Sequence, residues 1–282
     1  MRRISIFLVN AKIWGGTGRT KSVNEYKMKR IIIGICILAL LPCLGWADEL
    51  TGRDIALKVD AVDTSKDYKR TAVMVINRKG QKLIRKMESC NKKYGPDERG
   101  LIKFIEPPDV RGIMYLTWSY EDVERDDDMW VFLPAESLVR RISGGGKKGS
   151  FMRSDFANED IEKREVDDDE HRLLRSEQFS GVDCYVVERV SKKKKDTNYS
   201  KRIVWVRKDI WLPMKVEYYN KRGKQFKTAI YGGFKEIKEI WTITKIMVET
   251  PRKGSKTLMQ YDNMDYNIGL SDSLFEQSNL KR

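Results

Sequence analysis

The sequence has 282 residues, of which 55 are Lys or Arg, 41 are Asp or Glu, and one, His171, is a histidine. With 40% hydrophobic and 34% charged residues, it is neither a disordered chain nor a membrane protein with several spans, and its length allows one large or two modest domains. The single histidine excludes HExxH zinc sites and other centres built on several imidazoles, and no CxxC pair supports a zinc ribbon or a thioredoxin-type site.

Residues 28–47 have the organisation of a cleaved secretory signal peptide. Lys29-Arg30 forms a short basic start, an apolar run follows from Ile31 to Leu44, and Ala47 supplies the small residue of a cleavage site. A membrane anchor would need about 20 apolar residues, and this run is shorter. We therefore expect the mature chain to begin at Asp48 and to be a soluble, unanchored protein of the periplasm. Residues 1–27 are interpreted as an over-extended start without structure.

The charge of the remaining chain does not favour nucleic acid as a partner. Residues 1–47 hold eight of the basic residues and one acidic residue, so the remainder carries a net charge of only +7. Such a surface is compatible with transient contact with anionic membrane lipids. Two cysteines remain, Cys90 and Cys184, and export would allow them to form a disulfide. A free, half-buried pair is the alternative that we favour slightly.

The first predicted element of the mature chain is an amphipathic helix from Leu50 to Val62, with Thr51 as its cap. After it the apolar period changes to two, which indicates strands joined by links too short for crossover helices. The sequence therefore predicts one mainly β domain over residues 48–282 with an antiparallel, meander-like sheet. The candidate strands are 69–77, 81–91, 100–106, 112–120, 129–133, 171–179, 184–191, 202–208, 214–219, 225–231, 241–250 and 256–266.

One long segment, from Pro134 to Asp169, interrupts the strands. Residues 134–142 and 151–161 have helical character, and the glycine-rich stretch 144–149 between them is interpreted as a flexible connector. An excursion of this length from a continuous sheet is usually functional, as a lid or binding loop. The acidic runs 124–128 and 165–170 lack the ligand order of a calcium loop and are interpreted as turns.

The strand predicted over residues 112–120 is apolar on both faces. Met114, Leu116 and Trp118 share one face, and Ile113 and Tyr115 lie on the other, so this strand is expected to be covered on both sides. A curved sheet with large apolar residues inside and helices across its mouth could enclose a cavity for an apolar ligand. An ordinary core filled by its own side chains fits the same pattern, and periodicity alone does not separate the two.

Five motifs follow one another at close spacing: MYLTW (114–118), DDMWVFLPA (127–135), RRIS (140–143), SFMRSDF (150–156) and ED (159–160). Together they resemble the family of outer membrane lipoprotein-sorting proteins, which are LolA-like exported proteins. The resemblance continues through Val204–Arg207, Tyr218–Gly223 and the C-terminal end, and it covers nearly all of residues 48–282. One departure is Arg153, because the resemblance leads us to expect a small residue, often Gly, before Ser154-Asp155-Phe156.

The resemblance implies a strongly curved antiparallel sheet, an incomplete β-barrel of about eleven strands, closed by a few helices that form a lid. LolA, LolB and RseB share this fold and bind acyl chains of lipoproteins or related lipids between the sheet and the helices. It thus implies a periplasmic carrier that is not an enzyme, has no catalytic residue, metal or cofactor, and helps to deliver acyl chains towards the outer membrane. An RND-type inner-membrane transporter is the protein partner that the resemblance suggests.

The cavity predicted from these observations is lined by apolar residues of the central strands and of the insertion. A lipid-sensing regulator similar to RseB, with a protein partner, is the alternative. An enzyme is the least favoured interpretation. The only closely spaced candidates for catalytic residues are Ser154-Asp155 and Glu159-Asp160, and these are more simply explained as helix-capping residues. The predicted lipid-binding residues are Met114, Leu116, Trp118, Trp130, Phe132, Leu138, Ile142, Phe151, Met152 and Phe156.

Overall fold

The computed structural model of the protein describes residues 50–281. The predicted signal peptide, its cleavage site after Ala47 and the expected start over residues 1–27 lie outside this range. Within it, no helix has the length and apolar character needed to cross a membrane.

Helix α2 (Gly52–Asp60) opens the described chain, close to its predicted position. The side chain of Thr51 accepts a hydrogen bond from the backbone N–H of Asp54, and the Asp54 carboxylate accepts one from the N–H of Thr51, so the helix starts with a complete capping box. A Cβ atom at Gly52 would lie 2.7 Å from backbone atoms of Arg172 and Leu173. Glycine at this position therefore lets the helix pack directly against the backbone of a strand.

All twelve predicted strands are present, and the segment 241–250 is divided into two strands. Three further features differ from the prediction: strand β6 is additional, strand β12 is additional and pairs with β13 in a small separate hairpin, and the large sheet has 13 strands rather than about eleven. The strands are β1 (Asp67–Arg78), β2 (Gln81–Tyr94), β3 (Asp97–Glu106), β4 (Met114–Ser119), β5 (Asp128–Leu133), β6 (Leu138–Arg141), β7 (Asp169–Phe179), β8 (Val182–Ser191), β9 (Tyr199–Arg207), β10 (Pro213–Asn220), β11 (Gln225–Gly232), β12 (Lys235–Ile237), β13 (Ile240–Thr242), β14 (Lys245–Thr250) and β15 (Ser255–Tyr266).

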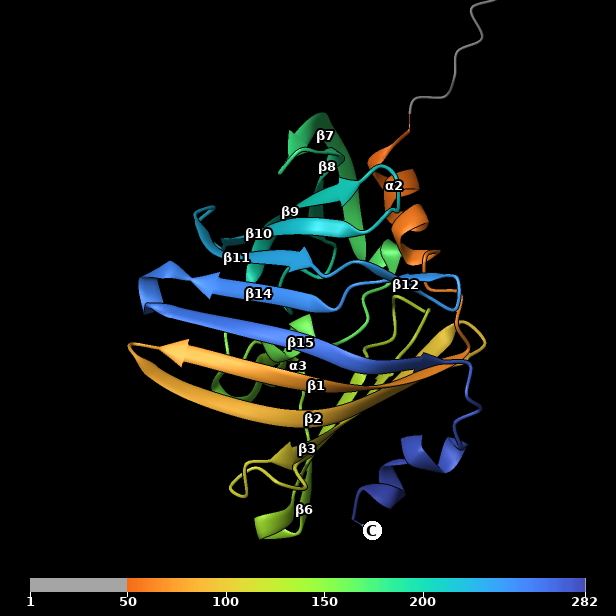
Figure 1. Ribbon diagram of the computed structural model, residues 1–282, viewed down its shortest axis with the longest axis vertical. Coiled ribbons are helices and arrows are strands. Elements are labelled where there is room, and N and C mark those ends of the chain that lie inside the picture. Colours follow the sequence, from red (N-terminus) through yellow and green to blue (C-terminus); the bar gives the residue numbers. More distant parts are fainter. Residues whose placement is uncertain (1–49, 282) are drawn as a thin grey trace, which may run out of the picture. The chain divides into compact units, whose positions relative to one another are not determined.

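The large sheet is antiparallel and strongly curved, and it is not closed into a barrel, as predicted. Its order is β6-β5-β4-β3-β2-β1-β15-β14-β11-β10-β9-β8-β7, so the first and last strands of the chain lie side by side in the middle (Figure 1). β6 and β7 form the two edges. We call the face that carries α2 the inner face and the opposite one the outer face.

The segment between the edge strands β6 and β7, residues 142–168, passes along the inner face; we call it the insertion. Its helices are single turns: α3 (Gly144–Lys147) and the 3-10 turns η2 (Phe151–Arg153), η3 (Asn158–Asp160) and η4 (Val166–Asp168). The helix predicted over residues 151–161 is wrong because Met152 and Arg153 both have positive φ, 48° and 62°. A continuous right-handed helix does not pass through such residues.

The helix predicted over residues 134–142 is also wrong. The 3-10 turn η1 (Pro134–Glu136) reverses the chain, and Leu138–Arg141 pairs with β5 in antiparallel register, with Trp130 opposite Arg141. The unpaired backbone groups of an edge strand attract such pairing, and this outweighs the helical spacing of Leu138, Val139 and Ile142.

A second segment covers the outer face. The 3-10 turns η6 (Asp272–Phe275) and η7 (Gln277–Lys281) lie against the half of the sheet formed by β2 to β6 (Figure 1). We call residues 270–281 the C-terminal cover. The part of the sheet built from β2 to β6 is therefore covered on both faces, as the apolar pattern of β4 predicts.

Candidate functional site

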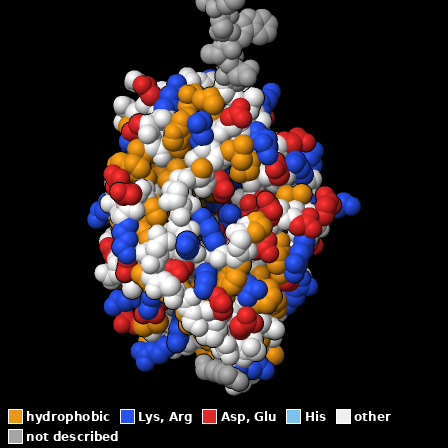
Figure 2. All heavy atoms as spheres, turned by 90° about the vertical axis from the view of Figure 1, so that its right-hand side faces the viewer, with side chains coloured by type: hydrophobic (Ala, Val, Ile, Leu, Met, Phe, Trp, Pro, Cys, Tyr) orange, Lys and Arg blue, Asp and Glu red, His pale blue; other side chains and the backbone are white. Residues whose placement is uncertain are grey.

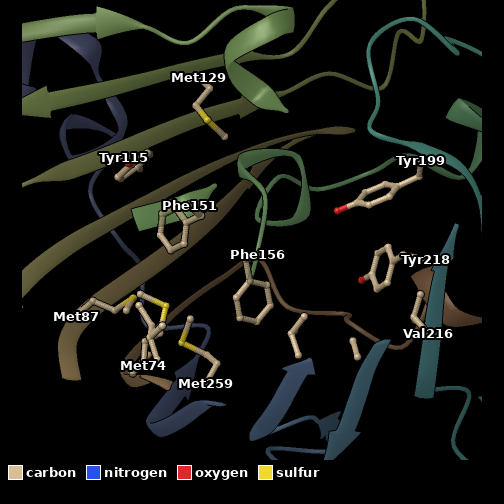
Figure 3. Packing of buried hydrophobic residues seen from close by; sticks show 14 of the residues in the cluster. Met74, Met87, Tyr115, Met129, Phe151, Phe156, Tyr199, Val216, Tyr218 and Met259 are labelled. Carbon is tan, nitrogen blue, oxygen red and sulfur yellow. The ribbon is translucent and has the colours of Figure 1, made fainter. Parts of the chain in front are cut away.

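The floor of the inner face below the insertion is rich in methionine. Met74, Met87 and Met259 come from the neighbouring strands β1, β2 and β15, and all three are buried. Figure 3 shows them gathered on the sheet side of Phe151 and Phe156, the two rings that the insertion places on this floor. Methionine side chains are flexible and polarizable, so this surface can adapt to ligands of different shape.

The two phenylalanine rings are held by aromatic neighbours of the sheet and of the insertion. Phe151 is fully buried, with its ring centroid 5.0 Å from that of Tyr115 and 5.8 Å from that of Phe104. Phe156 lies between the methionines on one side and Tyr199 and Tyr218 on the other (Figure 3). The insertion thus closes the inner face with its own side chains.

Polar side chains attach the insertion to the sheet. The Asp155 carboxylate accepts hydrogen bonds from the hydroxyls of Ser255, at 2.8 Å, and Thr257, at 2.7 Å. The Glu159 carboxylate accepts one from the Thr197 hydroxyl at 2.6 Å and lies 3.3 Å from the Arg202 guanidinium. Asp155 and Glu159, expected only as helix caps, therefore form long-range anchors.

Asp160 combines both roles. Its carboxylate accepts a hydrogen bond from the N–H of Ala157 at 2.7 Å, which caps η3, and it also binds the Lys227 ammonium at 2.6 Å and the Tyr199 hydroxyl at 2.9 Å. Burial lowers the pKa of Lys227 and raises that of Tyr199 well above its usual value. The ion pair is held within the inner core, where an unpaired charge would be costly.

Two small cavities lie on the inner face, beneath α2 and the insertion. One, of about 230 Å³, lies under α2 and is lined by Ile55, Val187 and Val204 together with charged groups such as Arg189. The other, of about 150 Å³, lies over the methionine floor, and Asp160 lines both. Since a 150 Å³ cavity holds about one benzene molecule, neither accepts a long acyl chain in this closed arrangement.

The surface between α2 and the C-terminal cover is hollowed. Figure 2 shows a depression near the middle of this face, with Lys and Arg side chains in and around it and hydrophobic side chains above it.

Among residues 50–281, no group of three or more His, Cys, Asp or Glu side chains is placed to hold a metal ion.

The structure separates the predicted lipid-binding residues into two sets. Phe151 and Phe156 belong to the inner core, and Ile142 and Met152 are half-buried against it. Leu138 is 36% exposed on the edge strand β6. The other five residues lie on the outer face, beneath Phe275 and Leu280 of the C-terminal cover; they are Met114, Leu116, Trp118, Trp130 and Phe132.

The prediction that these five residues face the insertion is wrong. Side chains alternate along a strand, and Tyr115, not its neighbours Met114 and Leu116, contacts Phe151. The inner set of Met74, Met87, Met259 and Tyr218 was not among the residues predicted from the sequence. Their signal was the alternation within β1, where Ala72, Met74 and Ile76 are buried.

Cys90 and Cys184 are both buried and free, as favoured from the sequence. Cys90 packs under the C-terminal cover, whereas Cys184 belongs to a separate cluster on the outer face of β8 to β10. Burial raises the pKa of the Cys90 thiol to about 11, which makes it unreactive at neutral pH.

Comparison with known proteins identifies relatives over most of this chain. A family model described as "Uncharacterized protein" matches residues 96–282, and no curated protein sequence matches. The crystal structure of a DUF1329 family protein from Desulfovibrio piger is 48% identical, with a TM-score of 0.79, and covers 81% of this chain and 97% of its own. An outer membrane lipoprotein-sorting protein domain from Vibrio parahaemolyticus is 30% identical, with a TM-score of 0.78, over 82% of this chain and 98% of its own.

A third structure shows the same fold at lower identity. The LolA superfamily protein NE2245 from Nitrosomonas europaea is 23% identical, has a TM-score of 0.66, and covers 82% of this chain and 99% of its own. All three structures therefore share the overall fold of this chain.

Proposed function

The chain belongs to the LolA-like family of outer membrane lipoprotein-sorting proteins, and we propose that it is a periplasmic carrier of lipid or lipoprotein acyl chains. In this proposal the acyl chain binds between the inner face of the sheet and the insertion. The protein then delivers the bound lipid or lipoprotein towards the outer membrane. It acts by binding and release, without catalysis.

The observation that carries the proposal is the methionine floor and the way in which it is closed. Phe151 and Phe156 are contributed by a segment of single turns and loops, and an acyl chain can take the place of their rings on Met74, Met87 and Met259. Burial stabilises by about 0.8 kcal/mol per CH₂, so a chain of about 16 carbons gains roughly 12 kcal/mol. The loss of translational and rotational freedom on association costs at least about 4 kcal/mol, so the expected dissociation constant is micromolar at the tightest.

The insertion has the features of a segment that can open. Its anchors to the sheet through Asp155 and Glu159 are polar, and water can replace these hydrogen bonds when the segment lifts. The glycine-rich stretch 144–149 at its start supplies backbone freedom for the movement. The closed cavities of about 230 and 150 Å³ require such a movement before an acyl chain can enter.

Locking the insertion tests the proposal. Asp155 and Ser255 are in direct contact, and a variant with Asp155→Cys and Ser255→Cys can be oxidised to join the insertion to β15. We expect a fluorescent fatty-acid analogue to bind the wild type and the reduced variant saturably, and the oxidised variant at least about ten-fold more weakly.

The two single cysteine variants, oxidised in the same way, are the matched controls and should bind as the reduced double variant does. Absence of saturable binding to the wild type, together with absence of lipid in the protein as purified, would contradict the carrier function. Equal binding by the locked and unlocked forms would contradict the inner face as the site.

A further inference from the structure

A strongly basic cavity of about 620 Å³ lies where the turns of β10–β11 and β14–β15 meet the insertion. In Figure 1 these two turns lie at the end of the sheet opposite α2. The walls of the cavity come from four segments of the sequence, within residues 148–157, 198–199, 220–227 and 250–253. The Lys and Arg residues that line it are Lys148, Lys221, Arg222, Lys224, Lys227, Arg252 and Lys253.

The positive charge of this cavity is largely uncompensated. Lys227 is paired with Asp160, but within residues 50–281 the other six have no carboxylate oxygen within 4.0 Å. Asp155 is the one acidic residue in the cavity wall, and its carboxylate is already bound by the hydroxyls of Ser255 and Thr257. The cavity therefore offers several free cationic donors to an incoming anion.

Two of these cations are fixed by backbone contacts. The Lys221 ammonium donates hydrogen bonds to the carbonyls of Lys194, at 2.6 Å, and Tyr199, at 3.2 Å, and the Lys148 ammonium donates to the carbonyl of Lys195. Burial and the neighbouring charge of Lys148 lower the pKa of Lys221. The clustered cations thus repel one another, and a bound anion would relieve that repulsion.

One wall of the cavity is apolar and leads to the inner face. Phe156, Tyr199 and Phe226 line it, and the rings of Tyr199 and Phe226 are stacked with centroids 6.0 Å apart. Phe156 also lines the 150 Å³ cavity over the methionine floor. A ligand with a charged end in the basic cavity could therefore place an apolar chain where the Phe156 ring now lies.

We propose that this cavity binds the phosphate group of an anionic amphiphile whose acyl chain occupies the inner face. Phosphate oxygens accept charge-assisted hydrogen bonds from Lys and Arg, and a phosphate monoester carries enough charge to engage several of them. The placement of the chain rests on the proposed carrier function, whereas the phosphate contacts do not.

Titration calorimetry with three matched probes separates the contribution of the phosphate from that of the acyl chain. The first probe is lauroyl lysophosphatidic acid. The second is monolauroylglycerol, which has the same acyl chain but no phosphate, and the third is sn-glycerol 3-phosphate, which has no acyl chain. We expect lysophosphatidic acid to bind at least about ten-fold more tightly than monolauroylglycerol. A variant with Arg222→Glu and Arg252→Glu, two exposed positions on separate turns, should abolish this difference. The difference should also shrink as salt concentration rises.

The control variant carries Lys235→Glu and Lys245→Glu, which change the net charge equally at exposed positions outside the cavity, and it should bind within two-fold of the wild type. If both lipids bind equally to wild type and variant, the phosphate site is wrong and the carrier function stands. If neither lipid binds but glycerol 3-phosphate binds in an Arg222- and Arg252-dependent manner, the ligand is a soluble phosphate compound and the lipid part fails. Loss of affinity in the control variant as well would show general charge attraction and overturn the site.

Discussion

The insertion on the inner face and the C-terminal cover on the outer face close the same half of the sheet by different means. The C-terminal cover is buried through apolar side chains: Phe275 is fully buried, Leu280 nearly so, and the Trp118 indole donates a hydrogen bond to the Phe275 carbonyl at 2.9 Å. Its own carboxylates, Asp272 and Glu276, pair with Lys92 and Arg99 at the exposed surface. The insertion also packs two aromatic rings on the sheet, and in addition it is attached by buried carboxylates.

This difference indicates which cover can move. Lifting an apolar cover exposes its surface to water without compensation, whereas carboxylates released from hydrogen bonds are hydrated again. A cavity of about 540 Å³ lies beside the C-terminal cover, lined by Leu101, Met114 and Leu274, but the tight contacts of Phe275 hold that segment in place. In the proposed carrier function, the ligand would therefore enter at the inner face.

The largest expected effect breaks the outer face. Leu116 is fully buried beneath the C-terminal cover, and Leu116→Arg forces a charge into this apolar cluster, at a cost of about 4 kcal/mol or more. We expect a protein that fails to fold or unfolds at much lower urea concentration. Leu138→Arg, the same change on the exposed edge strand, should stay within about 0.5 kcal/mol of the wild type. Near-equal stabilities of the two variants would refute the outer-face packing.

The next effect tests the polar attachment of the insertion. Lys227→Met leaves the buried Asp160 carboxylate without its cation and should lower the free energy of unfolding by about 3 kcal/mol. Lys224→Met, on the exposed part of the same hairpin, is the control and should change it by less than about 0.5 kcal/mol. Urea denaturation measures both. A loss below 1 kcal/mol for Lys227→Met would show that the pair does not hold the insertion.

A smaller effect depends on pH. Burial raises the pKa of Glu162, in the insertion, to about 7, although the Lys147 ammonium lies 2.8 Å from its carboxylate. The folded protein therefore holds this proton more tightly than the unfolded chain does. The resulting stabilisation is complete below about pH 4.5 and is lost as the pH rises through 7.

As the pH rises from 5 to 8, deprotonation of Glu162 should lower the free energy of unfolding of the wild type by about 2 to 3 kcal/mol. Glu162→Gln should lack that part of the pH dependence. Burial lowers the pKa of His171, and this group is present in both proteins, so comparison of the two cancels its contribution. Parallel urea-stability curves from pH 5 to 8 would contradict the raised pKa.

The smallest effect concerns backbone strain in the insertion. Arg153 has a φ of 62°, a conformation that glycine adopts without cost, and the family resemblance leads us to expect a small residue here. We expect Arg153→Gly to raise the free energy of unfolding by about 0.5 to 1 kcal/mol. Arg125→Gly, in an exposed turn, is a control for the general effect of glycine and should not stabilise. A destabilised Arg153→Gly protein would show that contacts of the Arg153 side chain outweigh the strain.

The sequence by itself determined the elements that depend on local rules. The capping box of Thr51 and Asp54 placed α2, and alternating apolar residues with short glycine-containing turns placed all twelve candidate strands and their antiparallel pairing. The resemblance added the curvature and the presence of a cover across the sheet. The break in the predicted helix at Met152 and Arg153 was not determined by the sequence.

Only the tertiary structure decided which apolar face of β4 is the inner one. Alternation defines the two faces of β4 but does not say which cover packs on which face. The covers are the segments around Phe151 and Phe275, which lie far apart in the sequence. The pairing of β6 with β5 and the meeting of Met74, Met87 and Met259 likewise depend on long-range contacts. A period of two fixes the faces of each strand, whereas the curvature of the sheet and its two covers fix the inside.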